Sequence, residues 1–354
     1  RGWWKQLWST EMGERHGLEK MRQVFVEAPR KVSIRERALP DPEDQEITVR
    51  AVLSGVSVGT ELAVYRGTIN TLTNSRWGYW TEYPIAPGYE LVGYVEKRGS
   101  GVRDVREGDR VVCHAPHGTH ATVSYQDYVV IPSSVRDEDA TMAMLGATTA
   151  HGFRQAKVVY GERILVLGLG VVGFLSGEHA RRGGAREVLL ADPLPWKRKI
   201  GEDRGFSTVL DPSLSTFEEE LLDHTGGSGV DLVIEASGNS SAIPLALLSV
   251  RRGGRILLQG TQTEPVSMQF SDYPMHKEVT FISTWGKGPA RTTDPEGGVW
   301  SRKANQQLAM ELIARGELRV SDLVTHRFPF DDIARVYNSL DDGELNYLQV
   351  ILNL

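Results

Sequence analysis

The clearest chemical signal in the sequence is a glycine-rich turn, Gly168-Leu-Gly170-Val-Val-Gly173, which follows a short apolar run. Gly168 permits a tight turn, Gly170 lets the main chain approach a pyrophosphate, and Gly173 lets the next helix pack on the strand. The N-terminal amides of that helix then face the anion. The pattern predicts a dinucleotide site, and Val171 and Val172 are expected to contact the cofactor with the glycines.

An acidic residue indicates which dinucleotide is bound. Asp192 ends the next predicted strand, at about the 20-residue distance typical of this motif. Its carboxylate would accept hydrogen bonds from a ribose 2′-hydroxyl and repel a 2′-phosphate, which favours NAD. NADP stays an alternative, because Lys197, Arg198 and Lys199 follow and could pair with a 2′-phosphate. A solvated helix face is the other explanation of these three residues.

A histidine series surrounds a turn next to the single cysteine: Cys113, His114, His117 and His120 in CHAPHGTH. Three imidazoles and a thiol could bind a metal ion. We favour a strand end and a loop, because Pro116 and the glycine after His117 indicate a turn and no carboxylate is close in sequence. Within this series, His120 is expected to reach the substrate.

The elements that must position these groups follow two patterns. Up to about residue 132, short strands rich in Val, Ile and Tyr alternate with glycine-containing turns. This predicts a β-rich domain of partly closed barrel type. The expected strands include 23–27, 47–53, 90–97, 110–114 and 127–131.

Beyond residue 137 the pattern changes to alternating helices and strands, which predicts a parallel sheet covered by helices on both faces. The expected strands are 163–167, 187–191, 232–236, 255–259 and 279–283, and the helices between them include 171–182, 195–204, 215–225 and 241–251. After a glycine-rich loop, the C-terminal segment is expected to form helices 303–315 and 330–340 and strands 323–328 and 347–352.

Length and composition limit the class of protein. At roughly 100 to 200 residues per domain, 354 residues indicate two domains. A net charge of −6 gives no reason to expect nucleic acid, and one cysteine excludes a disulfide framework. No apolar run reaches the ~18 residues of a membrane span. We therefore expect a soluble, cytoplasmic protein without a membrane partner.

Motifs spread along residues 21–354 resemble the medium-chain dehydrogenase/reductase superfamily, which contains the zinc alcohol dehydrogenases. They are SGVSVGTEL, YPIAPGYELVGYV, VREGDRVV, VDLVIEASG, GGRILLQG and LIARGELRVSDLVTHRFPFDDIARVYNSL, besides the glycine turn. The resemblance implies an α/β chain with a GroES-like β-rich catalytic domain plus a Rossmann doubly wound parallel-sheet domain. It also implies that a cleft between the domains holds the nicotinamide, and that the chain forms a homodimer through the nucleotide-binding sheet.

The resemblance sets the expected domain bounds. We expect a GroES-like domain at 21–150, a Rossmann domain at 151–288 and a C-terminal segment at 289–354 that returns to the catalytic domain. Residues 1–20 are expected to be an extension, either a leader or an aromatic arm that packs on a partner subunit with Trp3, Trp4 and Trp8.

The sequence departs from the zinc enzymes where they bind metal. The positions that match their cysteine, histidine and third ligand are Val58, Tyr89 and Leu145, and the four-cysteine lobe is missing. Two aliphatic side chains and a phenol cannot replace thiolate and imidazole as zinc ligands. We therefore expect no zinc. The strings SGVSVGTEL and PGYE also resemble the zinc-lacking bacteriochlorophyllide dehydrogenase branch, a likeness that we use as a branch label only.

Without a Lewis acid, other groups must handle the proton during hydride transfer. The resemblance places Thr60 at the hydroxyl of the zinc enzymes' proton relay and Tyr89 at a zinc-binding histidine. Tyr89 or Thr60 is expected to be the proton donor, with Glu61 or Glu90 orienting or tuning it. The alternative for both carboxylates is that they only satisfy buried main-chain groups.

Further residues are expected near the cofactor and the substrate. Thr149 and Ser237 are predicted to contact the cofactor, and His151 either faces the nicotinamide or lies in the core. Tyr65 and Trp80, in the aromatic segment 65–83, either line the substrate site or face a partner subunit. Trp285 either closes over the site or belongs to a mobile surface loop.

The predicted function is that of a zinc-independent NAD(P)-dependent oxidoreductase acting on a small molecule. It would move a hydride between the nicotinamide and a secondary alcohol or ketone of a small, possibly ring-containing metabolite. The alternatives are reduction of an activated C=C bond, nucleotide binding without turnover, and a non-redox lyase or epimerase that uses tightly held NAD.

Overall fold

The computed structural model describes residues 19–69, 82–271, 273–286 and 300–354. It divides into two compact units, one formed by the chain up to Met144 together with Val320–Leu354, the other by Leu145–Arg319. The expected bounds placed these divisions at 150/151 and 288/289, whereas the segment 300–319 belongs to the second unit. The predicted extension 1–20 lies almost wholly outside the described residues.

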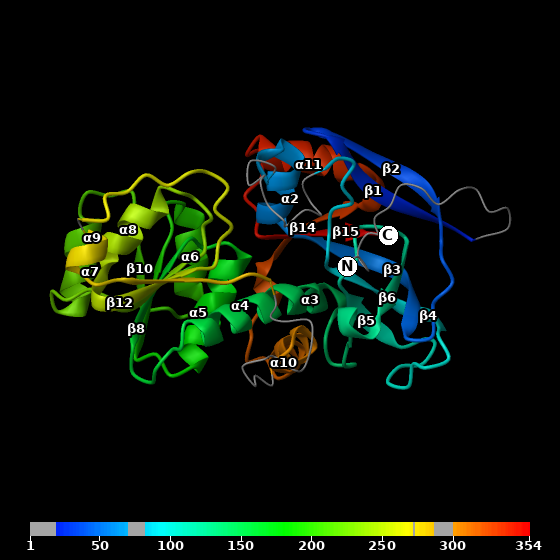
Figure 1. The fold of residues 1–354 in the computed structure, drawn as a ribbon, viewed down its shortest axis with the longest axis horizontal. Helices are drawn as coiled ribbons and strands as arrows, with labels where there is room; N and C mark the ends of the chain where they lie inside the picture. The colour runs from blue at the N-terminus through cyan, green and yellow to red at the C-terminus, as the bar shows by residue number, and fades with distance from the viewer. Residues whose placement is uncertain (1–18, 70–81, 272, 287–299) are drawn as a thin grey trace. The chain divides into compact units, whose positions relative to one another are not determined.

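The first unit is β-rich (Figure 1). Its larger sheet has seven strands in the order β14-β15-β3-β4-β5-β7, with β6 also paired to β3, and the pair β14–β15 is parallel. β1 and β2 form a separate antiparallel pair. The strands are β1 Lys20–Ala28, β2 Lys31–Ala38, β3 Glu46–Val56, β4 Leu91–Arg98, β5 Arg110–Cys113, β6 His120–Ser124, β7 Tyr128–Val130, β14 Val324–Pro329 and β15 Gln349–Asn353.

Two helices from opposite ends of the chain pack in one core of this unit: α2 (Val58–Arg66) and α11 (Ile333–Asp341). In α11 the buried side chains follow helical spacing, at Ile333, Val336, Tyr337 and Leu340. This apolar face covers the buried residues of α2, which places Tyr337 beside the first turn of α2. The short helix α3 (Asp137–Thr141) completes the unit.

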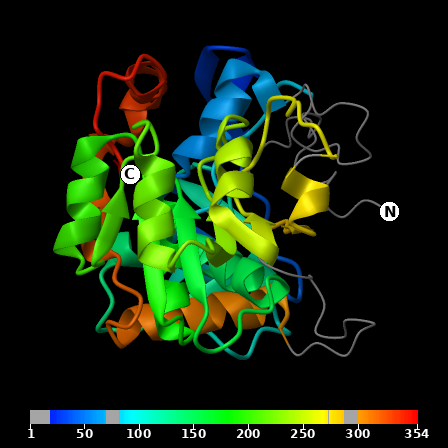
Figure 2. The ribbon, with the colours of Figure 1, turned by 90° about the vertical axis from the view of Figure 1, so that its left-hand side faces the viewer.

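The second unit is a six-stranded parallel sheet in the order β10-β9-β8-β11-β12-β13, with helices on both faces (Figures 1 and 2). Both faces are covered, and the strands β8, β9 and β11 are accordingly mostly apolar and buried. The strands are β8 Arg163–Leu167, β9 Glu187–Ala191, β10 Thr208–Leu210, β11 Val230–Glu235, β12 Val250–Leu258 and β13 Thr280–Ser283. The helices are α4 Ala143–Gln155, whose first two residues belong to the first unit, α5 Val171–Arg182, α6 Pro195–Asp203, α7 Phe217–Thr225, α8 Ala242–Ser249, α9 Tyr273–His276 and α10 Arg302–Ala314.

The predicted fold class is confirmed, and β8, α5 and β9 have the predicted bounds. The sequence did not single out β2, β6 or α2. The helix α2 has only nine residues, with Gly59 in its first turn and a left-handed Gly67 as C-cap. Such a short helix gives little periodic signal. Across the described ranges, no helix is both long enough and apolar enough to cross a membrane.

Candidate active site

The first turn of α2 is held by a reciprocal contact between Ser57 and Glu61. Ser57 precedes the helix as its N-cap, and its N–H donates to Glu61 Oε1 at 2.7 Å. The N–H of Glu61 donates back to the carbonyl oxygen of Ser57 at 3.0 Å. An acidic side chain in this place satisfies a main-chain donor at the positive end of the helix dipole. The Ser57 side chain makes no capping hydrogen bond, so it is available for another contact.

The Glu61 carboxylate is fully buried in a polar network. Its Oε2 lies 2.8 Å from His117 Nε2 and accepts a hydrogen bond of 2.6 Å from the Tyr337 hydroxyl. The other ring nitrogen of His117 lies 2.7 Å from Ser54 Oγ. Burial, followed by the Glu61 charge, raises the pKa of Tyr337 well above its usual value, so Tyr337 stays a donor. Each oxygen of Glu61 has a partner within the protein, which fits an orienting role rather than direct contact with a substrate.

The Tyr89 phenol lies next to this turn. Its hydroxyl is hydrogen-bonded to Ser57 Oγ, and its ring stacks on His114 with centroids 5.7 Å apart. Burial is the largest cause that raises the pKa of Tyr89, followed by the charge of Glu90, with a smaller contribution from Glu61. Hydrogen bonds with Ser57 and Thr60 lower the same pKa but do not cancel the increase. Tyr89 is therefore a neutral phenol near pH 7 and can donate a proton.

Glu90 follows Tyr89 and directly precedes β4. It is fully buried, and its Oε2 accepts a hydrogen bond of 2.8 Å from Gln349 Nε2. The Glu90 carbonyl accepts from the N–H of Gly55 at 2.8 Å. A Cβ on Gly55 would lie 2.4 Å from Glu90 Oε2, so the close approach of these strands requires glycine there. Glu90 thus links the start of β4 to β3 and β15. Its charge helps to raise the pKa of Tyr89.

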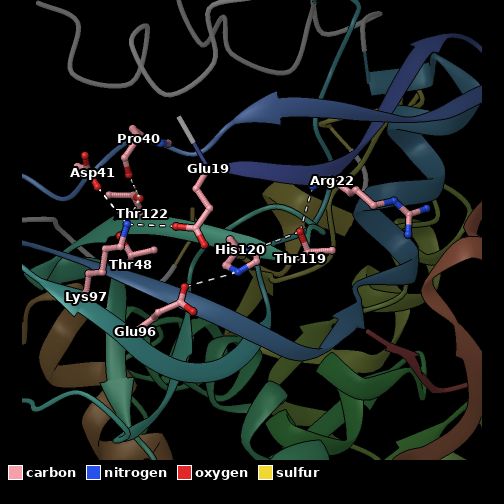
Figure 3. Close-up of polar contacts among 10 residues, drawn as sticks. All are labelled: Glu19, Arg22, Pro40, Asp41, Thr48, Glu96, Lys97, Thr119, His120 and Thr122. Atoms are coloured by element: carbon pink, nitrogen blue, oxygen red, sulfur yellow. Dashed lines mark hydrogen bonds and ion pairs between the residues drawn. The ribbon is translucent and has the colours of Figure 1, made fainter. Parts of the chain in front are cut away.

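The three histidines of CHAPHGTH point to different partners. His114 stacks on Tyr89, and His117 binds Glu61. His120, expected to reach the substrate, contacts Thr119 Oγ1 at 3.1 Å and has its Nε2 3.6 Å from Glu96 Oε2 (Figure 3). Over the described ranges, no group of three or more His, Cys, Asp or Glu side chains could hold a metal ion.

The residues expected near the substrate differ in how far they are buried. Tyr65, expected either to line the substrate site or to face a partner subunit, is buried against Tyr337, with its hydroxyl bonded to Asn338. This is because the apolar face of α11 covers it. Trp285 is 60% exposed, and His151 is partly buried in α4, where burial and then Arg154 lower its pKa. Trp80 lies outside the described residues.

The glycine turn has a shape that leaves room for a ligand at one glycine only. Gly168 has a φ of +91°, and a Cβ there would lie 2.7 Å from Ser237. A Cβ on Gly173 would lie 1.9 Å from the carbonyl oxygen of Gly168. At Gly170, which precedes α5, a Cβ would meet no described atom within 4 Å. Two glycines therefore serve the fold, and the third leaves the main chain open to a pyrophosphate.

Asp192 lies buried directly after β9, next to this turn. Its Oδ2 accepts from the N–H of Leu169 at 2.8 Å, and its Oδ1 accepts from the N–H of Leu194 at 2.9 Å. Lys197 Nζ lies 3.9 Å from Oδ2. Arg198, for which pairing with a 2′-phosphate and a solvated helix face were the two alternatives, pairs with Asp211 at 2.9 Å and donates to the carbonyl oxygen of Asp192. Arg198 is thus already engaged within the unit.

The other predicted cofactor residues make internal contacts. Thr149 is buried, and its hydroxyl donates back to the carbonyl oxygens of Leu145 and Gly146. Ser237 follows β11, and both its N–H and its hydroxyl donate to Glu235 Oε1. Glu235 was not among the predicted site residues; it is fully buried and also binds Gln262. The signal was present, because a carboxylate ends the apolar strand VDLVIE.

Comparisons with known proteins relate the chain to dehydrogenases. Residues 43–167 match the family model described as alcohol dehydrogenase GroES-like domain, and residues 171–296 match the one described as zinc-binding dehydrogenase. The chain is 25% identical over 349 residues to L-galactonate-5-dehydrogenase of Escherichia coli, covering 90% of this chain and 95% of that protein. It is 26% identical over 308 residues to sorbitol dehydrogenase of Bacillus subtilis, covering 76% and 85%.

Solved structures support the same fold. The structure of galactitol-1-phosphate dehydrogenase from Escherichia coli superposes with a TM-score of 0.78 at 19% identity. The match covers 94% of this chain and 100% of that one. At this level of identity, the likeness establishes the fold alone.

Proposed function

The chain belongs to the medium-chain dehydrogenase/reductase superfamily and is an NAD(P)-dependent dehydrogenase; from this premise we propose that it interconverts a secondary alcohol and a ketone without zinc. The observation that supports the proposal is the Tyr89 phenol, which the motif resemblance matches to a zinc-binding histidine and which is hydrogen-bonded to Ser57 and Thr60. The names of the relatives, which include sorbitol and L-galactonate dehydrogenases, support a small hydroxylated substrate.

The zinc-free part of the proposal rests on the chemistry of the available donors. Val58 cannot bind a metal, and a neutral phenol is a poor replacement for imidazole. His117 and Cys113 are directed elsewhere: His117 binds Glu61 and Ser54, and the Cys113 thiol donates to the carbonyl oxygen of Leu91. Burial also raises the pKa of Cys113, which disfavours the thiolate that zinc needs.

NAD is the proposed cofactor. The residues that would hold it are the open main chain at Gly170, the first turn of α5 and the Asp192 carboxylate. Lys197 lies near Asp192, and Arg198 pairs with Asp211. Because the Asp192 carboxylate would repel a 2′-phosphate and Arg198 already has an acidic partner, the site favours an unphosphorylated ribose. When bound, the nicotinamide supplies or accepts the hydride.

The protein's part in the reaction is the transfer of one proton. In ketone reduction, the O–H bond of Tyr89 breaks and its proton joins the substrate oxygen, while the electron pair stays on Tyr89 Oη. Ser57 and Thr60 stabilise that oxygen by hydrogen bonding. Oxidation runs the same step in reverse. Since Tyr89 has a raised pKa, the resting phenol carries the proton that ketone reduction uses.

We also propose a homodimer. In the described part of the chain, β13 ends the parallel sheet and pairs only with β12. Its outer edge therefore offers main-chain groups to the same strand of a second copy. Sedimentation equilibrium would show twice the chain mass, and a monomer at all concentrations would contradict this assembly.

Kinetics with a panel of small secondary alcohols and ketones tests the proposed reaction, using NAD(H) and NADP(H). We expect turnover with at least one pair and a preference for NAD(H). Binding of NADH without any turnover would contradict the proposal. Substrate conversion without a change in NADH absorbance would indicate a non-redox reaction instead.

A further inference from the structure

We propose that Ser57 is the positioning residue of the Tyr89 proton donor, and that the buried Glu61–His117 pair fixes Ser57 through its main chain. This inference rests on the proposed function. It assigns roles to Ser57 and His117. Neither role follows from the spacing of the motifs or from the positions that match zinc ligands.

Tyr89 lies in the segment before β4 and is held at two points. His114 stacks on its ring at an interplanar angle of 18°, which limits the tilt of the ring. The Ser57 hydroxyl binds the phenol oxygen, which sets the direction of the O–H bond. A hydroxyl can both accept and donate, so Ser57 can accept from the neutral phenol and donate to the phenolate.

Ser57 itself is almost wholly buried and is fixed by its main chain. Its N–H binds Glu61 Oε1, and its carbonyl oxygen accepts from the N–H of the same glutamate. Since the Ser57 side chain takes no part in capping α2, its hydroxyl is directed to Tyr89 at no cost to the helix.

Glu61 is fixed in turn by His117 and Tyr337, from a loop and from α11. The main chain of His117 is bonded on both sides, to the carbonyl oxygen of Pro87 at 2.9 Å and to the N–H of Val24 at 3.0 Å. Gly88 admits the ring, because a Cβ at this left-handed residue would lie 2.8 Å from it. Gly88, the glycine of the PGYE motif and the residue before Tyr89, therefore makes room for the His117 ring.

A double-mutant cycle tests the link between Ser57 and Tyr89. Ser57→Ala should lower the single-turnover rate of ketone reduction by about tenfold or more in the wild-type background. In the Tyr89→Phe background the same change should have almost no effect, because Ser57 acts only through the phenol. Ser57→Thr should restore most of the rate. An equal loss in both backgrounds would overturn the proposal.

A matched control separates positioning from general damage. Ser124→Ala removes another serine hydroxyl of the same unit, one that binds Asp127, and should leave the rate unchanged. The affinity for NADH should be the same in all these variants. If Ser57→Ala does not fold, Ser57→Gly and Ser57→Thr provide the same comparison, since glycine is also accepted as an N-cap.

A spectroscopic readout keeps the test independent of turnover. In protein labelled with ¹³Cζ-tyrosine, the Tyr89 resonance is identified by its loss in Tyr89→Phe. Ser57→Ala and Glu61→Gln should shift this resonance, whereas Ser124→Ala should not. If Ser57→Ala leaves the chemical shift of the Tyr89 resonance unchanged, the positioning proposal is overturned even if the enzyme is active. A wild-type protein that converts no substrate overturns the proposed function, and with it the catalytic meaning of Ser57, while the resonance still reports the contact.

Discussion

Glu61 Oε2 and His117 Nε2 lie 2.8 Å apart, although 56 positions separate the two residues in the sequence. Both side chains are fully buried. Removal of His117 would take one of its partners from a buried carboxylate, which keeps the contacts with Tyr337 and Ser57 but loses the imidazole, and such a loss is costly in a medium of low dielectric constant.

His117→Ala should therefore lower the free energy of unfolding by about 3–5 kcal/mol. His120→Ala is the matched control from the same segment, because His120 is partly exposed and lies 3.6 Å from Glu96. Its loss should change stability by about 1 kcal/mol or less. Urea titrations measure the free energy of unfolding of both variants. An equal loss in His117→Ala and His120→Ala would contradict the buried network of Glu61 and His117.

The glycine turn offers a second matched pair. Gly173→Ala places a Cβ against the Gly168 carbonyl oxygen and should destabilise the second unit by about 1–3 kcal/mol. Gly170→Ala meets no described atom and should leave stability nearly unchanged. It should nevertheless weaken NADH binding by about tenfold or more, because the main chain must approach the pyrophosphate. Calorimetric titration measures the affinity, and an unaffected Gly170→Ala variant would contradict the site.

The sequence predicted the second unit better than the first. The turn from Gly168 to Gly173 requires glycines for local steric reasons, and the strand before it and the helix after it are strongly periodic, so their bounds were confirmed. The interior of the first unit depends on contacts distant in sequence. Tyr337 contacts Glu61 although 276 positions separate them in the sequence, and no local sequence pattern predicts that contact.

The site residues show the same contrast. Tyr89 and Thr60 could be named because their motifs match a family with known chemistry. Their supports, Ser57 and His117, could not be ranked, since a histidine series gives no sign of which ring points inward. The His117 ring packs against Gly88, whose positive φ and closeness to the ring are seen only in the structure.

Asp192 should determine the choice of cofactor. Asp192→Asn should weaken NADH binding by about tenfold and reduce the discrimination against NADPH, because a charged acceptor is replaced by a neutral one. Lys199→Ala, an exposed position of the helix α6 that follows Asp192, should change neither affinity. Fluorescence titrations with both dinucleotides measure the ratio. A variant that still prefers NADH by the wild-type factor would contradict this role.

His179 should make the second unit sensitive to acid. Burial lowers its pKa to about 4, from an ordinary value of 6.5. The unfolded chain therefore binds a proton between these values when the folded chain does not, so stability falls as pH decreases from 6.5 to 4. The loss should reach about 3 kcal/mol.

His179→Gln should flatten this part of the stability profile, with unfolding followed at intervals between pH 7.5 and pH 4.5. His224→Gln is the control, because His224 is exposed in α7 and binds no main-chain group among its described contacts. A wild-type profile that does not fall over this range would contradict the buried neutral imidazole.

The most direct test of the account is the rate of ketone reduction by metal-depleted protein, measured for wild type and Tyr89→Phe with metal content determined on the same samples. The account predicts that the metal-free wild type keeps its activity, and that Tyr89→Phe loses about a hundredfold or more in rate while binding NADH normally. Activity that rises in proportion to bound zinc, or a Tyr89→Phe variant as fast as wild type, would contradict it.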